Sequence, residues 1–181
     1  MRFTKTIVLK NGKSCLVRNA EEFDGKSVLE SFNLTHSQTE YLLSYPDENY
    51  FTEAQESLFL KKKAESENEI ELVAVIDNVV VGTAGVEAIG IKYKIKHRAE
   101  FGISILKEFW GLGIGTALLE ACIECARLAG YTQLELNVVS DNEPAIAMYK
   151  KAGFIEFGRN PKGFNSRTLG FQELVYMRLE L

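Results

Sequence analysis

The sequence predicts an α/β domain: a mixed, mostly antiparallel sheet of about seven strands, flanked by about four helices. Runs of β-branched and apolar residues recur from residue 14 to the C-terminus, and segments with helical spacing of apolar residues lie between them. One such segment connects two strands and implies locally parallel pairing, whereas a hairpin signal upstream implies antiparallel pairing. The 181 residues, 46% of them hydrophobic and 25% charged, suffice for one domain over residues 1–181.

The first half of the chain combines a strand and two helices with a meander of strands. A strand is expected over residues 14–20, helices over 22–32 and 52–66, a hairpin over 69–90 and a further strand over 97–106. Thr52 can cap the second helix, and Asp77 and Asn78 form a turn signal between two β-branched runs. Residues 35–50 form a long polar and aromatic connection between the helices.

The second half alternates helices and strands. A helix follows the glycine-rich residues 110–116 and ends near Gly130, a suitable C-cap, before a strand over 131–139. Another helix begins at Asp141 or Asn142, has Pro144 in its first turn and ends at Gly153. The chain finishes with strands over 154–160 and 171–181.

Composition and charge argue against several classes of partner. The formal net charge of −4 provides no broad basic field, so we expect no nucleic-acid partner. Arg2, Lys5 and Lys10 surround only a short apolar run, unlike a signal peptide, and no segment approaches the roughly 20 apolar residues of a membrane span. We therefore expect a cytoplasmic protein with no membrane partner, where its three cysteines stay reduced.

The segment WGLGIGTALLEA, residues 110–121, places Gly111, Gly113 and Gly115 at the start of a helix. A helix N-terminus presents unpaired N–H groups and the positive end of the helix dipole, which suits a phosphate group. A mononucleotide P-loop needs Lys and then Ser or Thr after Gly115, and a dinucleotide fingerprint needs a third glycine at residue 116 or 118; both are missing. A tight strand-to-helix turn without a ligand remains the alternative for this segment alone.

Residues 102–154 resemble the core of the GNAT superfamily of acyl-CoA-dependent N-acyltransferases. They contain, in the expected order, the strand, a loop related to [QR]-x-x-G-x-[GA], the helix and the ending N-x-x-A-x-x-x-Y-x-x-x-G-F. Trp110 stands where Gln or Arg is usual, Gly113 and Gly115 match, and Gly111 is additional.

The resemblance implies a GNAT-like fold and an acetyl-CoA-dependent N-acetyltransferase. Such an enzyme transfers the acetyl group directly, in a ternary complex, to a primary amine of a small molecule, an amino acid or a peptide. Many relatives are dimers, so a homodimer is a further expectation. The alternative is a CoA-binding sensor or structural module that keeps the fold without turnover.

The resemblance also assigns the cofactor site. The strand residues expected along the pantetheine are Ile103, Ser104 and Ile105. The main-chain N–H groups expected at the pyrophosphate belong to Gly111, Leu112, Gly113, Ile114, Gly115 and Thr116. The side chain of Asn142 is expected to hydrogen-bond the cofactor from the opposite side.

Acyl transfer from a thioester needs a neutral amine, a stabilised oxyanion and a proton for the thiolate. Tyr149 matches the family's general-acid tyrosine and is expected to bind at the cofactor; the alternative is a core tyrosine at helical spacing. Glu135 and Glu100 are the candidate bases, acting through water, or else surface carboxylates. Asn137 occupies the place where some protein N-terminal acetyltransferases of this superfamily carry their Glu, which disfavours that substrate class.

Two other features of the sequence say less about function. The C-x-x-C of Cys122 and Cys125 lies within a helix, with no second pair and no nearby histidine, so we expect core side chains and no metal. By the resemblance, the acceptor enters between residues 44–51, which are acidic and aromatic, and residues 158–171, which are basic. An acidic rim suits a cationic amine, a basic rim suits an acceptor with a carboxylate or phosphate, and a mixed rim suits an amino acid or a peptide terminus.

Overall fold

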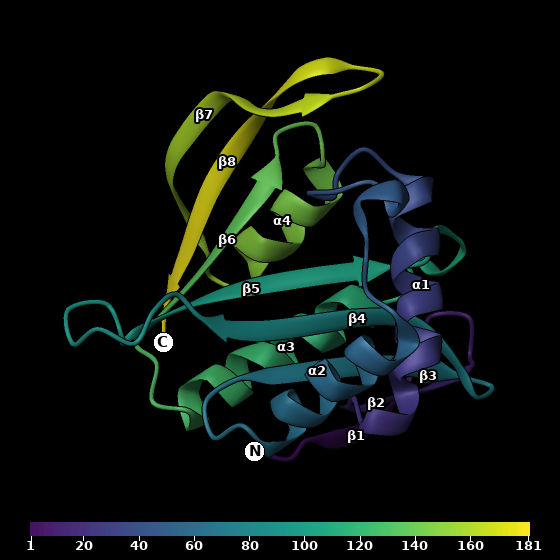
Figure 1. Cartoon of the computed structure of the whole chain (residues 1–181). Helices are drawn as coiled ribbons and strands as arrows, with labels where there is room; N and C mark the ends of the chain where they lie inside the picture. The colour runs from purple at the N-terminus through teal and green to yellow at the C-terminus, as the bar shows by residue number, and fades with distance from the viewer.

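One mixed sheet runs through the molecule in the order β1-β2-β3-β4-β5-β6-β8-β7, as the computed structural model of residues 1–181 shows (Figure 1). Its strands are β1 (Thr4–Val8), β2 (Ser14–Asn19), β3 (Ile70–Ile76), β4 (Val79–Ala88), β5 (Arg98–Ile105), β6 (Gln133–Val139), β7 (Ile155–Ser166) and β8 (Gly170–Glu180). Only β5 and β6 pair in parallel; every other neighbouring pair is antiparallel. The predicted fold class is confirmed.

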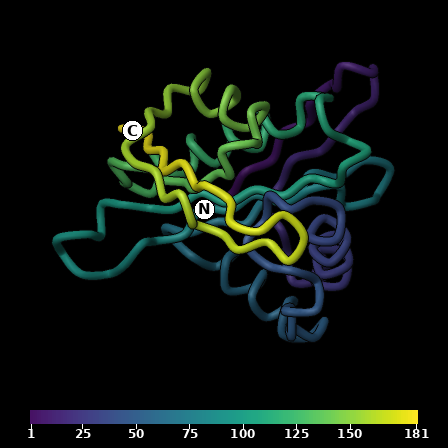
Figure 2. The backbone as a smooth tube through the Cα atoms, turned by 90° about the horizontal axis from the view of Figure 1, so that it is seen from above, coloured from purple at the N-terminus to yellow at the C-terminus, as the bar shows by residue number.

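Four α-helices cover the two faces of the sheet. They are α1 (Gly25–Gln38), α2 (Glu53–Glu65), α3 (Ile114–Leu128) and α4 (Glu143–Lys151). Figure 2 shows α1 and α2 on one face, and α3 and α4 on the other. The main core, which includes Ala99 and Leu118, lies on the α3 side, and a smaller cluster of Val28, Leu60 and Val73 lies under α1 and α2. No helix is both long and apolar enough to cross a membrane.

Local signals in the sequence place the element ends correctly. Asp77 and Asn78 have φ of 49° and 65° and make the tight turn between β3 and β4. Thr52 caps α2 and forms a capping box with Gln55. Asn142 caps α4 by accepting a hydrogen bond from the N–H of Ala145 at 3.3 Å.

Two sequence-based expectations are corrected. The sheet has eight strands instead of about seven, because β1 pairs with β2 through the turn at Asn11 and Gly12. The side chains of β1 are mostly exposed, so this strand lacks the apolar alternation that identified the others. The first helix begins at Gly25, after a short 3₁₀ turn, and extends to Gln38 instead of ending at residue 32.

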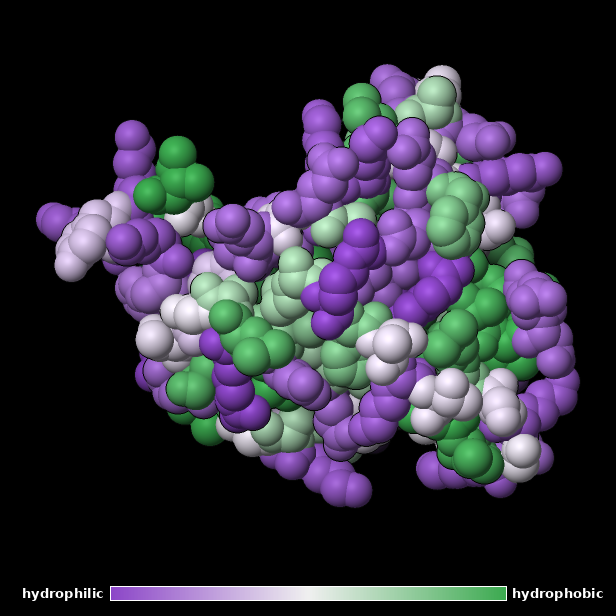
Figure 3. Space-filling model, turned by 90° about the horizontal axis from the view of Figure 1, so that it is seen from below, coloured by the Kyte–Doolittle hydropathy of each residue, from purple (hydrophilic) through white to green (hydrophobic).

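The loop between β4 and β5 projects from the body of the molecule (Figures 1 and 2). Figure 3 shows this projection on the left, with hydrophilic residues around a hydrophobic group. Ile91 and Tyr93 are more than four-fifths exposed there, at 88% and 82%. Lys96 lies 4.8 Å from the centroid of the Tyr93 ring. The loop leads into the first residue of β5, Arg98, whereas the glycine-rich segment follows the last, Ile105.

Strands β5 and β6 lie side by side only at their first residues. Arg98 to Glu100 pair with Gln133 to Glu135, and beyond this point each strand keeps only its outer neighbour, β4 or β8. Figure 1 shows the two strands diverging, with α4 beside the opening. The sheet therefore contains an opening, between the C-terminal parts of β5 and β6, in which main-chain groups have no strand partner.

Candidate functional site

The free edge of β5 forms one wall of this opening. Ile103, Ser104 and Ile105 pair with β4 on one side and face the opening on the other. Because main-chain groups of a strand point alternately to its two sides, every second N–H and C=O along this segment is directed at the opening. A ligand with amide groups can hydrogen-bond to such an edge.

The glycine-rich loop lies at the end of β5 and leads into α3. Gly111 and Gly113 have φ of 73° and 103°, and a Cβ on either would meet no atom within 4 Å, so the backbone conformation itself requires glycine. The N–H groups of residues 111 to 116 donate no hydrogen bond within the chain; the first to do so is Ala117, to the carbonyl of Gly113. The loop and the first turn of α3 thus present a series of free donors at the positive end of a helix dipole.

Gly115 connects the loop to its surroundings by close packing. A Cβ at this position would stand 3.2 Å from Sδ of Met148 in α4 and 3.4 Å from Cδ1 of Ile105 in β5. The residues predicted at the pyrophosphate are therefore next to the end of β5 and to α4. The structure brings together the segments from three parts of the chain that the sequence assigned to one cofactor.

Trp110 has a structural role that sequence reasoning missed. Its indole Nε1 donates a hydrogen bond to the carbonyl oxygen of Ile105 at 2.7 Å. This bond ties the loop to the end of β5 although the side chain is 42% exposed. The sequence did contain one indication of this role: Trp, like the Gln or Arg that is usual here in the family, carries a side-chain N–H donor.

Tyr149 lies in α4 with its ring buried beside the opening. The ring centroid is 6.1 Å from that of Phe101 in β5 and 5.9 Å from that of Phe154. The hydroxyl has no hydrogen-bond partner in the chain, and its oxygen keeps some contact with solvent. It is therefore accessible to a ligand. Burial raises the pKa of Tyr149 above its ordinary value, which keeps the phenol protonated at neutral pH.

Asn142 begins the same helix, so α4 carries two of the predicted site residues. Its Oδ1 is used by the cap, at 3.3 Å from the N–H of Ala145, while its Nδ2 has no partner in the chain. The amide group can therefore donate one hydrogen bond to a ligand without loss of the helix cap.

The two candidate bases differ in their partners. Glu135 of β6 is held by Arg98 in a two-pronged ion pair, with N–O distances of 2.5 and 2.7 Å, and also accepts from Gln133 at 2.9 Å. Its carboxylate is thus neutralised and fixed in position. Both of its oxygens are therefore already engaged by donors of the chain.

Glu100 of β5 is the neighbour of Glu135 across the parallel pairing and has no cationic partner. It accepts one hydrogen bond from Nδ2 of Asn137 at 3.3 Å. Partial burial and the carboxylates of Glu87 and Glu135 raise the pKa of Glu100. Such a carboxylate is better suited than Glu135 to accept a proton.

The two segments predicted to border the acceptor site are bonded to each other. Glu40 and Tyr45 lie in the connection between α1 and α2, and Ser166 and Arg167 at the turn between β7 and β8. Ser166 Oγ and the Tyr45 hydroxyl both donate to Oε2 of Glu40, at 2.8 and 2.7 Å, and the N–H of Arg167 donates to the Tyr45 oxygen at 2.9 Å. These bonds join segments that are about 120 residues apart in the chain.

Most charges in these two segments form ion pairs. Asp47 receives two hydrogen bonds from Arg167, at 2.8 and 2.9 Å, and Arg159 is paired with Glu156 and Glu173. The acidic and the basic segment therefore largely neutralise each other or their neighbours. Their sequence charges are no guide to the charge of the acceptor.

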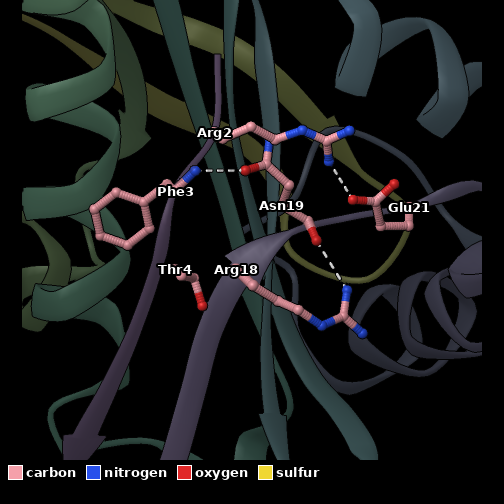
Figure 4. A pocket seen from close by; sticks show the side chains of 6 residues that line it. All are labelled: Arg2, Phe3, Thr4, Arg18, Asn19 and Glu21. Carbon is pink, nitrogen blue, oxygen red and sulfur yellow. Dashed lines mark hydrogen bonds and ion pairs between the residues drawn. The ribbon is translucent and has the colours of Figure 1, made fainter.

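Neither the cavity beside β1 and β2 nor the Cys122–Cys125 pair offers a second site. A cavity of about 270 Å³ at the β1–β2 corner is lined by Arg2, Phe3, Thr4, Arg18, Asn19 and Glu21 (Figure 4). Its two guanidinium groups are already paired, Arg2 with Glu21 and Arg18 with Asp24. Cys122 and Cys125 are buried in the core on α3, and no group of His, Cys, Asp or Glu side chains is placed to hold a metal ion.

Comparisons with known proteins identify the family of the chain. Residues 32–154 match the family model described as the acetyltransferase (GNAT) family. The L-amino acid N-acetyltransferase AaaT of Escherichia coli (strain K12) is 29% identical over 163 residues, 90% of this chain and 95% of that protein. A crystal structure of a GNAT-family acetyltransferase from Streptococcus pneumoniae has a TM-score of 0.88 and 28% identity, with 92% of this chain and 99% of that chain covered.

A structure of yncA from Salmonella typhimurium with its cofactor acetyl-CoA shares the fold. Its TM-score is 0.81 at 19% identity, over 92% of this chain and 94% of that chain. The family model covers more than half of the chain, including β3 to β6 and the helices around the opening. The chain therefore belongs to the GNAT family of acetyltransferases, and it is an acetyl-CoA-dependent N-acetyltransferase.

Proposed function

We propose that acetyl-CoA binds across the opening between β5 and β6. The pantetheine lies along Ile103 to Ile105, the pyrophosphate accepts hydrogen bonds from the N–H groups of residues 111 to 116, and Asn142 donates from the α4 side. The observation that carries the proposal is the series of unpaired N–H groups at the start of α3, continuous with a free strand edge. A dianionic pyrophosphate satisfies donors that otherwise have only water.

The chemistry that fits this arrangement is direct transfer in a ternary complex. The nitrogen of a neutral amine attacks the thioester carbonyl, the C–N bond forms and the C–S bond breaks. Tyr149 donates its hydroxyl proton to the departing thiolate. Glu100 accepts the proton released by the amine, directly or through one water molecule, whereas Glu135 serves to fix Arg98 between the two strands.

For the acceptor, we propose the primary amine of an amino acid or another small molecule. The similarity to AaaT over most of both chains supports this class. Asn137, in place of the base that some protein N-terminal acetyltransferases carry, makes a peptide terminus the less favoured acceptor. We also propose the cytoplasm as the location, because all three thiols are free and buried.

The test is release of the CoA thiol from acetyl-CoA in the presence of a panel of amines. We expect amine-dependent release by the wild type, a loss of rate in Glu100→Gln, and a nearly unchanged rate in Glu135→Gln measured below its melting temperature. CoA binding without thiol release for any amine would instead identify a non-catalytic CoA module. A larger rate loss in Glu135→Gln than in Glu100→Gln would contradict the assignment of the base.

A further inference from the structure

A row of three residues crosses the centre of the sheet on the face that carries α1 and α2. Glu71 of β3 pairs with Gly85 of β4, and Gly85 pairs with Gly102 of β5. A Cβ on Gly85 would collide with Oε2 of Glu71, so this carboxylate lies over the glycine. A Cβ on Gly102 would meet no atom within 4 Å. The two glycines leave open space between the Glu71 carboxylate and the free edge of β5.

Polar side chains of the neighbouring rows border this space. Thr83 and Ser104, in the next row, have their hydroxyl oxygens 3.3 Å apart. In the preceding row Glu87 pairs with Glu100. The space is therefore bordered by hydroxyl groups at one end and by carboxylates at the other, and its floor has no side chain.

Negative charge exceeds positive charge around Glu71. Lys63 of α2 is buried and bonds to Glu69 and Glu87, each at 2.8 Å, whereas Glu71 forms no ion pair. Burial raises the pKa of Glu71 to about 8, and the carboxylates of Glu87 and Glu56 add to this effect. Lys63 acts in the opposite direction. A cation placed next to this group would stabilise its ionised form.

We propose that Glu71 and the open space over Gly102 form a subsite for a second cationic nitrogen of the acceptor. Preferred acceptors are then diamines, or amino acids with a basic side chain. The inference rests on the proposed function, which places the reacting amine at the free edge of β5. Neighbouring strands are about 5 Å apart, so the carboxylate over β4 lies roughly 5–10 Å from that edge, a distance that a chain of four or five methylenes spans.

The subsite has a defined pH dependence. The charged groups that act on Glu71 are Glu56 and Lys63 of α2 and Glu87 of β4. Only the ionised carboxylate holds the second ammonium, so the KM of a diamine relative to a matched monoamine falls as pH rises toward about 8 and then levels off. The ratio of the two KM values removes the effect of deprotonating the reacting amine, which both acceptors share.

The experiment compares matched acceptors on the full-length enzyme: 1,5-diaminopentane with pentylamine, and lysine with norleucine. The two pairs distinguish a free diamine from a basic amino acid. We expect the wild type to favour the dicationic member of at least one pair by tenfold or more in kcat/KM, about the contribution of one ion pair in a partly dehydrated site. Glu71→Gln should remove this preference through KM and change the rate with the monoamine less than about twofold.

Two further variants keep the test decisive. Glu67→Gln removes the same charge from an exposed loop position and should leave the preference unchanged. Gly102→Val fills the open space with Glu71 intact and should raise the KM of the dicationic acceptor. An equal preference for both members of each pair in the wild type, or an equal loss for both in Glu71→Gln, overturns the subsite. If no amine releases thiol, the proposed function fails, and calorimetric binding of 1,5-diaminopentane to the CoA-saturated wild type and Glu71→Gln proteins decides the subsite separately.

Discussion

Replacing Tyr149 by Phe removes one hydroxyl group from the opening between β5 and β6. The ring keeps its contacts with Phe101 and Phe154, whose centroids are 6.1 and 5.9 Å away. The hydroxyl has no partner in the chain, so its loss leaves no other polar group unpaired. We therefore expect the free energy of unfolding to change by less than about 0.5 kcal/mol, and the affinity for CoA to change little.

Turnover should fall about 100-fold in this variant. General acid catalysis contributes roughly 10²- to 10⁴-fold, and the lower end applies because a thiolate, with an ordinary pKa of about 8.5, is a good leaving group that water can protonate. The loss corresponds to about 2.7 kcal/mol of transition-state stabilisation. Since burial raises the pKa of Tyr149, the wild-type phenol remains a proton donor across the neutral range.

The assay is single-turnover acetyl transfer to a productive amine, which isolates the chemical step from product release. Tyr131→Phe is the matched control: Tyr131 is also buried, but its hydroxyl accepts a hydrogen bond from Asn68 at 2.8 Å. This control should lower stability and leave the rate unchanged. An unchanged rate constant in Tyr149→Phe would refute the general-acid role and reduce Tyr149 to a packing residue.

Three further predictions concern binding and stability. CoA at 100 times its dissociation constant should stabilise the fold by about 2.7 kcal/mol in scanning calorimetry, and no shift in melting temperature at millimolar CoA would contradict the cofactor site. Gly113→Val forces a β-branched residue to a φ of 103° and should weaken CoA binding at least tenfold. Trp110→Phe should weaken it less, because it loses one hydrogen bond that contributes about 0.5–1.5 kcal/mol. Titration calorimetry compares the two dissociation constants, and weaker binding in Trp110→Phe than in Gly113→Val would disprove the loop assignment. Folding raises the pKa of Glu71 to about 8, so the contribution of this carboxyl group to stability is fully present below its ordinary pKa and is lost as pH rises to about 8. Urea titrations should therefore show Glu71→Gln gaining stability relative to the wild type over this interval, by up to about 1.4 kcal/mol per pH unit. A stability difference that stays constant with pH would contradict the burial of this carboxylate.

Features that depend only on neighbouring residues could be predicted from the sequence. The turn at Asp77 and Asn78 and the caps at Thr52 and Asn142 depend on backbone and side-chain chemistry within a few residues, and the structure places all of them as predicted. The glycines of the loop belong to the same class, because the need for a positive φ at Gly113 is a local property.

Features that depend on distant partners were not readable. Asp47 and Arg167 are 120 residues apart, so the neutralisation of the rim charges follows only from the fold. The same holds for Glu135, which the sequence could not separate from Glu100 without the ion pair to Arg98, 37 residues away. The first strand was missed because most of its side chains face solvent, which removes the alternation that identifies a half-buried strand.

The backbone amides around the opening test the central claim most directly, namely that acetyl-CoA binds across the opening between β5 and β6. ¹H–¹⁵N correlation spectra with and without CoA should show the largest shifts for residues 103–105 and 111–116. The amides beside the Arg2 and Arg18 cavity should shift little. Large shifts confined to that cavity or to other surfaces, with the amides of residues 111–116 unchanged, would contradict the account.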